Sequence, residues 1–184
     1  MSRLITLAAA VGTLCLTQLA LTGAAVPPSG PRPAVSAKAG DGAFSGNRKV
    51  AISFEYSAPA FLWLDPEGRL AGNVELTDRS LFVLAPVGDQ HQIRTAVGAP
   101  ACLGIKHMAD GPDKVVAAVC NPAAAGQLFT FAQRTDKDSQ GRRKFGILNA
   151  ESELTFSSLD GVHMQPRGCY PAVGFALVDK GPAR

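Results

Sequence analysis

The sequence has little charge of either sign, and this scarcity already excludes one class of partner. Its 184 residues include 18 lysines and arginines against 15 acidic residues, for a net charge of +3. Nucleic-acid binding requires a dense electropositive surface, so we expect no nucleic-acid partner. Hydrophobic residues make up 46% of the chain, a proportion typical of one folded domain rather than of a disordered chain.

Catalytic signatures are absent as well. The chain has neither the Gly-x-Ser-x-Gly motif of serine hydrolases nor the His-Glu-x-x-His motif of zinc proteases. Its carboxylates are scattered, and Glu151 and Glu153, which would share a strand face, are more typical of a solvated face. Cys169 is conceivable as a nucleophile with His163 or His91 as its base, but no local signature supports this pairing. We therefore predict no catalytic residue and no enzymatic activity.

Only one long apolar run occurs, and it opens the chain. After Arg3, residues 4–21 are almost entirely apolar or small, and residues 22–25 (Thr-Gly-Ala-Ala) suit cleavage by signal peptidase. We therefore predict a signal peptide over residues 1–25 and a protein that is secreted, extracellular or at the cell surface. The alternative is an uncleaved membrane anchor, because the run approaches the length that spans a bilayer. No second such run follows, so we expect no membrane partner after cleavage.

Residues 26–47 are rich in proline and glycine, and their only large apolar side chain is Phe44. Such a segment buries too little surface to offset the entropy lost on ordering, so we expect a disordered linker. The folded domain is then predicted over residues 48–184. In an exported protein its three cysteines favour one disulfide and one remaining thiol.

Short alternating runs separated by turn residues make up this domain, and no segment has the sustained apolar period of a helix. We therefore predict an all-β fold. The charged stretch at residues 134–144 is interpreted as a polar loop, with Arg142-Arg143-Lys144 as a processing site or a contact for an anionic glycan. In the first strand, Val50, Ile52, Phe54 and Tyr56 would share one face. The predicted strands are residues 50–56, 61–64, 81–84, 114–120, 128–131, 144–147 and 175–178.

An approximate threefold repeat of about 46 residues underlies these runs. Phe82, Phe129 and Phe175 are spaced 47 and 46 residues apart. Upstream of each lie a second apolar run and an isoleucine, namely Ile52, Ile93 or Ile147. Repeats of this length are typical of β units arranged around an axis, and one aromatic per repeat predicts that the three rings belong to the core. A sandwich whose strands are alike by chance is the alternative.

The same repeat argues against a metal site. His107-Met108 and His163-Met164 offer soft ligands that suit copper in an exported protein. The first pair lies 13 residues before Cys120 and the second 6 before Cys169, so threefold symmetry would not bring them together. We therefore predict neither a metal ion nor a cofactor.

Residues 101–131 resemble part of a known family. The segments Ala101-Cys102-Leu103-Gly104-Ile105, Cys120-Asn121 and Gln127-Leu128-Phe129 resemble one repeat of the ricin-type β-trefoil lectins, with Gln-x-Phe in place of their Gln-x-Trp signature. The resemblance implies three repeats closed into a six-stranded barrel with a hairpin cap. It also implies a disulfide between Cys102 and Cys120, which would contribute about 3 kcal/mol by closing a loop. Cys169 is then a free thiol, an intermolecular bridge or an alternative partner for either cysteine.

Sugar recognition needs an acidic or amide group for the hydroxyls and an aromatic face for the ring. In the lectin family the key Asp directly follows the Cys-Leu pair, where this chain has Gly104. Asn121 and Gln127 match polar positions of the family pattern, and Trp63 with Asp65 is the best aromatic–acid pair, so we predict these four as ligand-binding residues. The alternative is that Asp65 only forms a turn and Trp63 only belongs to the core. The third repeat offers Asp160, His163 and Tyr170.

These features predict a secreted, non-catalytic protein that binds a carbohydrate, such as an extracellular glycan or a cell-wall polysaccharide. One alternative is a structural surface protein, because Arg167-Gly168-Cys169-Tyr170-Pro171 and Phe175-Ala176-Leu177-Val178 resemble the end of small secreted fungal cell-wall proteins of the phialide-development type. Another is a protease inhibitor, because trefoils also present loops to proteases and Arg142-Arg143-Lys144 would be the bait.

Overall fold

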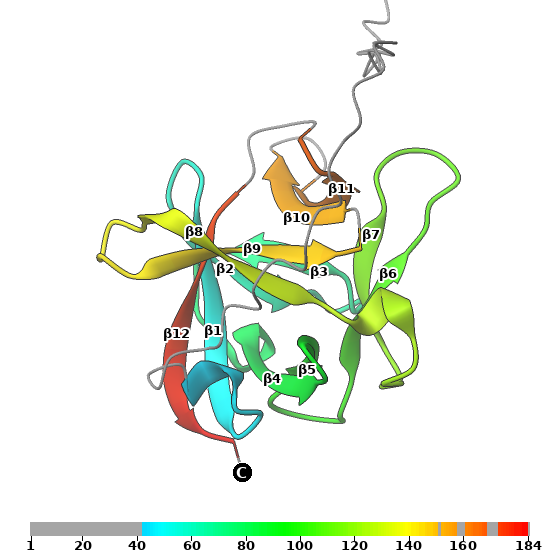
Figure 1. Ribbon diagram of the computed structural model, residues 1–184, viewed down its shortest axis with the longest axis horizontal. Helices are drawn as coiled ribbons and strands as arrows, with labels where there is room; N and C mark the ends of the chain where they lie inside the picture. The colour runs from blue at the N-terminus through cyan, green and yellow to red at the C-terminus, as the bar shows by residue number, and fades with distance from the viewer. Residues whose placement is uncertain (1–41, 151, 158–160, 169–172, 184) are drawn as a thin grey trace, which may run out of the picture. The chain divides into compact units, whose positions relative to one another are not determined.

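The computed structural model describes residues 42–150, 152–157, 161–168 and 173–183, which form twelve strands and three short 3₁₀ turns (Figure 1). The predicted signal peptide and most of the predicted linker lie outside the described residues, as do Glu151, Asp160, Cys169 and Tyr170. Nowhere in the described ranges is a helix long and apolar enough to span a membrane. The all-β prediction is confirmed.

Four strands build each repeat. The first repeat comprises β1 (Arg48–Glu55), β2 (Pro59–Leu64), β3 (Leu70–Asn73) and β4 (Leu81–Val87). The second comprises β5 (Gln90–Thr95), β6 (Cys102–Lys106), β7 (Lys114–Ala118) and β8 (Thr130–Lys137). The third comprises β9 (Arg143–Asn149), β10 (Ser152–Ser157), β11 (Gly161–Pro166) and β12 (Phe175–Pro182). The 3₁₀ turns η1 (Gly42–Phe44), η2 (Asp78–Ser80) and η3 (Ala125–Gln127) precede β1, β4 and β8.

The first and fourth strands of the three repeats close into a barrel. Antiparallel pairing joins β1 to β4 and β12, β4 to β5, and β9 to β8 and β12. The ring closes between β5 and β8, where His91 and Phe129 exchange backbone hydrogen bonds of 2.8 and 2.9 Å. The second and third strands of each repeat pair as hairpins. Two isolated bridges join the hairpins: Val116 of β7 pairs with Arg69, and Asp113, directly before β7, pairs with Met164. This barrel with its hairpin cap is a β-trefoil, as the sequence predicted.

The strand register places the three phenylalanines at one position of the repeat. Each pairs with the first strand of its own repeat: Phe82 with Val50, Phe129 with His91, and Phe175 with Phe145. The isoleucines two residues after these partners, and one leucine from each second strand, complete a buried set: Ile52, Ile93, Ile147, Leu62, Leu103 and Leu154. These side chains and the three phenylalanines are at most 1% exposed. The predicted core is therefore confirmed, and its burial is the main favourable contribution to folding.

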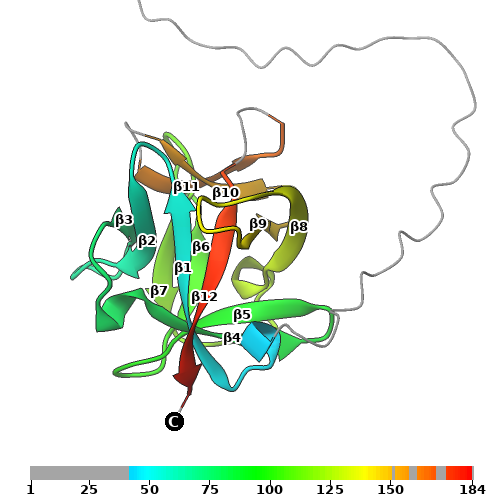
Figure 2. The ribbon, with the colours of Figure 1, turned by 90° about the vertical axis from the view of Figure 1, so that its left-hand side faces the viewer.

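The folded domain begins before Arg48, so part of the predicted linker belongs to it. Phe44, the last residue of η1, packs its ring against His91, Phe131 and Phe145, with centroid separations of 5.2, 5.2 and 5.5 Å. Proline and glycine suggested a linker, but the area that one aromatic ring buries holds this turn on the barrel. Figure 2 shows η1 beside β4, at the opposite end of the barrel from β10 and β11.

Residues 134–144, predicted as a polar loop, instead form the tip of the β8–β9 hairpin. β8 extends to Lys137 and β9 begins at Arg143, and the pairing shifts register between Gln133 and Lys137 before the turn. In that turn the Asp138 side chain is 3% exposed, and its carboxylate accepts hydrogen bonds from the backbone N–H of Arg142 (2.8 Å) and from its Nε (2.5 Å). Burial raises the pKa of Asp138, but the bonds and charge of Arg142 outweigh it and lower that pKa. Charges that suggested a loop are therefore paired within a hairpin.

Replacing Phe44 with alanine should lower the free energy of unfolding by about 2 kcal/mol, because the half-buried ring leaves a gap against its aromatic neighbours. Urea denaturation of the protein measures this change. Val74→Ala is the matched control, since Val74 is 68% exposed and should contribute little. Equal effects of the two substitutions would contradict the placement of Phe44 in the folded domain.

His91 should make the stability of the protein depend on pH. Its ring packs on Phe44 and Phe131, and its Nδ1 is buried without a hydrogen-bond partner among the described residues. Burial lowers the pKa of His91 below its ordinary value of 6.5, against a smaller opposing effect of the Phe44 backbone. The unfolded chain therefore binds the proton more readily, and stability should fall as the pH drops below about 6.5.

The variant His91→Phe tests this dependence, because it removes the titrating group and keeps an aromatic ring. Between about pH 7.5 and pH 5.5, the urea midpoint of the natural chain should fall further than that of the variant. If both midpoints fall by the same amount, His91 does not carry the dependence.

Candidate functional site

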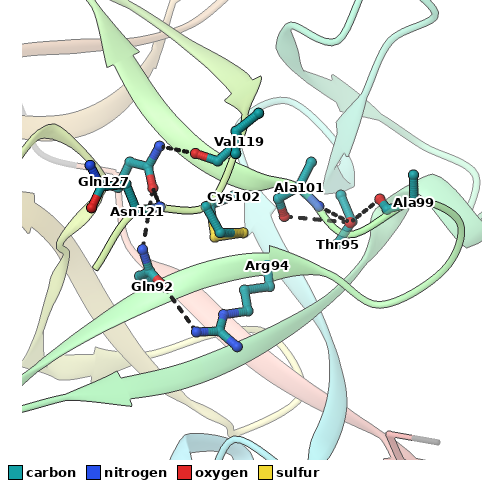
Figure 3. Close-up of a disulfide and its surroundings, with 10 residues drawn as sticks. Gln92, Arg94, Thr95, Ala99, Ala101, Cys102, Val119, Asn121 and Gln127 are labelled. Carbon is teal, nitrogen blue, oxygen red and sulfur yellow. Dashed lines mark hydrogen bonds between the residues drawn. A yellow bond between two sulfur atoms is a disulfide. The ribbon is translucent and has the colours of Figure 1, made fainter. Parts of the chain in front are cut away.

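The disulfide implied by the family resemblance is present in the second repeat. Cys102 opens β6 and Cys120 follows β7, with Cα atoms 4.9 Å apart and a sequence separation of 18. A loop of this length contributes about 3 kcal/mol in the chain-entropy model. The bond holds the segment that leads from β7 through Asn121 to η3 against β6 (Figure 3).

Gln127, predicted as a ligand-binding residue, is buried and hydrogen-bonded within the protein (Figure 3). Its Oε1 accepts from the backbone N–H of Asn121 at 2.8 Å and from Nε2 of Gln92 at 3.2 Å. Its Nε2 donates to the carbonyl oxygen of Val119 at 2.8 Å. The amide therefore joins β5 to the segment after the disulfide, and both of its polar atoms are engaged.

Asn121 is exposed, but its side chain also serves the local fold. Its Oδ1 accepts from the backbone N–H of Ala123 at 3.0 Å, which forms an Asx turn. Gly104, where the lectin family has its key Asp, lies directly beside Gln127: a Cβ at Gly104 would be 3.3 Å from Cγ of Gln127. A side chain as large as Asp at this position would crowd that amide, so the second repeat has little room for the family's acidic residue.

Asp65 is placed by the tight turn between β2 and β3. Its carboxylate accepts from the backbone N–H of Arg69 at 2.8 Å and from Nε of Arg69 at 2.7 Å. Burial raises the pKa of Asp65, but the hydrogen bonds and charge of Arg69 outweigh it and lower that pKa. Trp63 lies half-buried on β2, where it pairs with Ala71. Gly104, which pairs with Val116, occupies the equivalent position of the second repeat.

The structure brings Asn121 and Gln127 together but joins neither to the first-repeat pair. In the described part of the chain, no hydrogen bond or ion pair links Trp63 or Asp65 to those two residues. His163, the third-repeat candidate within the described ranges, is buried on β11 with its Nδ1 3.1 Å from the carbonyl oxygen of Gly161.

A shallow groove of about 170 Å³ lies where the first repeat meets the third. Three aromatic rings contribute to it: Phe54 at the end of β1, Tyr56 just after it, and Phe156 on β10. The Phe156 ring lies 5.1 Å from the Tyr56 ring and 5.2 Å from the Phe54 ring. Tyr56 is 58% exposed. The rest of this aromatic groove is small or polar and consists of Ser57, Ala58, Ala60, Gly72, Asn73 and Val74.

A second groove, of about 250 Å³, lies at the equivalent junction between the first and second repeats. The strand pairings show which residues of the two grooves occupy equivalent positions. The second groove has Thr95 in place of Phe54, Val97 in place of Tyr56, Ala101 in place of Ala60, Ala117 in place of Gly72 and Leu64 in place of Phe156. Asp65, Asp78 and Arg79 also line it. The two grooves therefore share one backbone position but differ in chemistry: one is aromatic and uncharged, and the other contains charged side chains.

Sequence reasoning missed Tyr56 as a candidate because it placed this residue on one strand face with Val50, Ile52 and Phe54 and extended the strand to residue 56. The strand instead ends at Glu55, and the turn residues Ser57 and Ala58 follow Tyr56 before β2 begins at Pro59. A tyrosine immediately before a turn is the signal that favours an exposed ring.

Comparisons with known proteins identify the fold. No family model matches the chain, and no curated protein does. Among solved structures, the BEL β-trefoil in an apo crystal form matches 73% of this chain and 95% of its own, with a TM-score of 0.57 and 16% identity. An endo-β-galactosidase from Clostridium perfringens that releases GlcNAcα1-4Gal matches 72% of this chain but only 32% of its own, with a TM-score of 0.53 and 9% identity.

A salivary protein from Culex quinquefasciatus, of a cysteine- and tryptophan-rich family, matches 76% of this chain and 99% of its own, with a TM-score of 0.53 and 16% identity. At such identities these likenesses concern the fold alone. The chain has a β-trefoil fold.

Replacing Gln127 with alanine should destabilise the protein by about 2 kcal/mol, because it leaves the buried Gln92 amide and two part-buried backbone groups without their partner. Thermal and urea unfolding measure the change. Gln140→Ala is the control, since Gln140 is exposed on the β8–β9 turn and should contribute little. A stable Gln127→Ala protein that had lost glycan binding would instead identify this amide as a ligand contact.

Proposed function

We propose that the protein is a secreted, non-catalytic carbohydrate-binding protein that takes one sugar unit of an extracellular or cell-wall polysaccharide in the aromatic groove. The observation that carries the proposal is the exposed Tyr56 ring beside Phe156 in a small groove. The apolar C–H face of a sugar ring stacks on an aromatic face, and nearby amide and hydroxyl groups can bond its hydroxyls. Asn73 and Ser57 are such groups.

The size of the groove supports a shallow site for one unit of a polymer. Its volume of about 170 Å³ is below that of the pockets that enclose whole small-molecule ligands. Binding of a single unit would therefore be weak.

Export of the protein is supported by its covalent chemistry. A structural disulfide such as Cys102–Cys120 persists in oxidising compartments and is rare in the cytosol. This agrees with the signal peptide predicted over residues 1–25.

Trp63 and Asp65 are a second possible location for the site, as the sequence predicted. Trp63 keeps part of its surface accessible, but the Asp65 carboxylate is already engaged by Arg69. The protease-inhibitor alternative gains no support from its predicted bait, because the Arg142 guanidinium bonds Asp138 at 2.5 Å and Ser53 at 3.3 Å.

Tyr56→Ala should weaken retention on the bound glycan by about tenfold, the loss expected for one aromatic contact. The measurement is a screen of the protein against soluble glycans and insoluble polysaccharides, followed by titration of whatever binds. Val97→Ala is the matched control, because Val97 occupies the equivalent position of the second groove and is 44% exposed.

The proposal fails if no glycan binds, or if Tyr56→Ala and Val97→Ala both bind like the natural chain. Loss of binding in Trp63→Ala with no effect of Tyr56→Ala would place the site at the first-repeat hairpin instead.

A further inference from the structure

The aromatic groove has no charged residue among those that line it in the described part of the chain. A charged sugar placed there would lose solvation without gaining an ion pair, which is unfavourable. The second groove, which contains Asp65, Asp78 and Arg79, differs in this respect. The ligand of the aromatic groove is therefore a neutral unit rather than a uronic acid or a free amino sugar.

One wall of the groove is apolar and close to the backbone. Ala58, Ala60 and Val74 contribute small side chains, and Gly72 contributes none. A Cβ at Gly72 would lie 2.8 Å from Cζ of Phe54 and 3.4 Å from Cε2 of Phe156, so the backbone approaches the rings as closely as it can. The wall can therefore cover a methyl-sized group but offers nothing to a hydroxyl.

An amide donor stands next to this wall. The Oδ1 of Asn73 accepts from the backbone N–H of Glu75 at 3.3 Å, which distinguishes the oxygen of the amide from its nitrogen. The Nδ2 group has no hydrogen-bond partner among the residues that the structure describes. Asn73 lines the groove, so its two N–H donors are available to a carbonyl oxygen.

We infer that the unit taken by the aromatic groove is an N-acetylhexosamine, an inference that rests on the proposed function. The acetamido oxygen accepts a hydrogen bond from Nδ2 of Asn73, and the acetamido methyl packs against Ala58, Ala60 and Val74. The C–H face of the pyranose ring lies on Tyr56. A hexose has a hydroxyl in place of the acetamido group, so it loses the apolar contact and the carbonyl acceptor together.

Titration by two-dimensional ¹H–¹⁵N NMR of the protein tests this inference and detects weak binding of monosaccharides. The probes are N-acetylglucosamine against glucose, and N-acetylgalactosamine against galactose. At least one acetylated sugar should bind about tenfold more tightly than its hydroxyl counterpart, the discrimination typical of one small group in an apolar pocket. Glucosamine, which is charged, should bind no better than glucose.

Asn73→Asp tests the donor, because it keeps the shape of the side chain and removes both N–H groups. It should abolish the preference for the acetylated sugar. Asn47→Asp makes the same chemical change at an exposed position outside the groove and should leave the preference intact.

Equal affinity for acetylated and hydroxyl sugars overturns the inference, and so does a preference that survives Asn73→Asp. If polysaccharide retention depends on Tyr56 but no acetylated sugar competes, the inference fails and the proposed function stands. If neither polysaccharides nor monosaccharides bind, both fail.

Discussion

Closure of the barrel between β5 and β8 is the contact on which the rest of the structure depends. Each other adjacent pair of barrel strands shares two or more paired residues, whereas these two meet at the bridge between His91 and Phe129. Two features stabilise this closing contact. Phe44 covers the His91 ring from η1, and Gln127, two residues before Phe129, anchors the approach to the strand. An open barrel would leave strand edges unpaired and the Phe129 ring exposed.

This constraint explains why the residues of the second repeat that resemble the lectin family have structural roles. The disulfide and the Gln127 amide set where the chain enters the closing strand, so their polar atoms and the space around Gly104 are already used. In the first repeat, Asp65 is likewise occupied by the turn that it forms with Arg69. The exposed Tyr56 ring, in contrast, lies where two repeats join, beyond the end of a barrel strand.

The threefold backbone supplies equivalent junctions, and a few side chains decide what each can bind. Phe54, Tyr56 and Phe156 make one junction aromatic, whereas Thr95, Val97 and Leu64 occupy the same positions of the next. Because backbone pairing and the buried core maintain the fold, these surface positions can change without loss of the barrel. The chemistry of each groove is thus set by its own junction, not by the repeat as a whole.

Much of the architecture was determined by the sequence itself. The even spacing of Phe82, Phe129 and Phe175 and the alternation of the runs between them predicted an all-β threefold fold and its core, and the likeness to ricin-type lectins implied the disulfide. These features are visible in a sequence because burial imposes a period and a residue type on it. The charged residues 134–144 were wrongly predicted as a loop for the complementary reason. Contacts between the two strands of a hairpin impose no periodic pattern on the sequence.

Only the tertiary structure decided which polar and aromatic side chains are exposed and which are packed or hydrogen-bonded within the protein. Composition classed Phe44 with a linker, and an alternating pattern placed Tyr56 on the same strand face as Phe54. Phe44 instead packs on the barrel, and Tyr56 is exposed in a groove. Both outcomes depend on contacts between residues far apart in sequence, Phe44 with Phe131 and Tyr56 with Phe156. A local pattern reflects how a residue relates to its own strand, whereas a groove of this kind forms where two repeats meet.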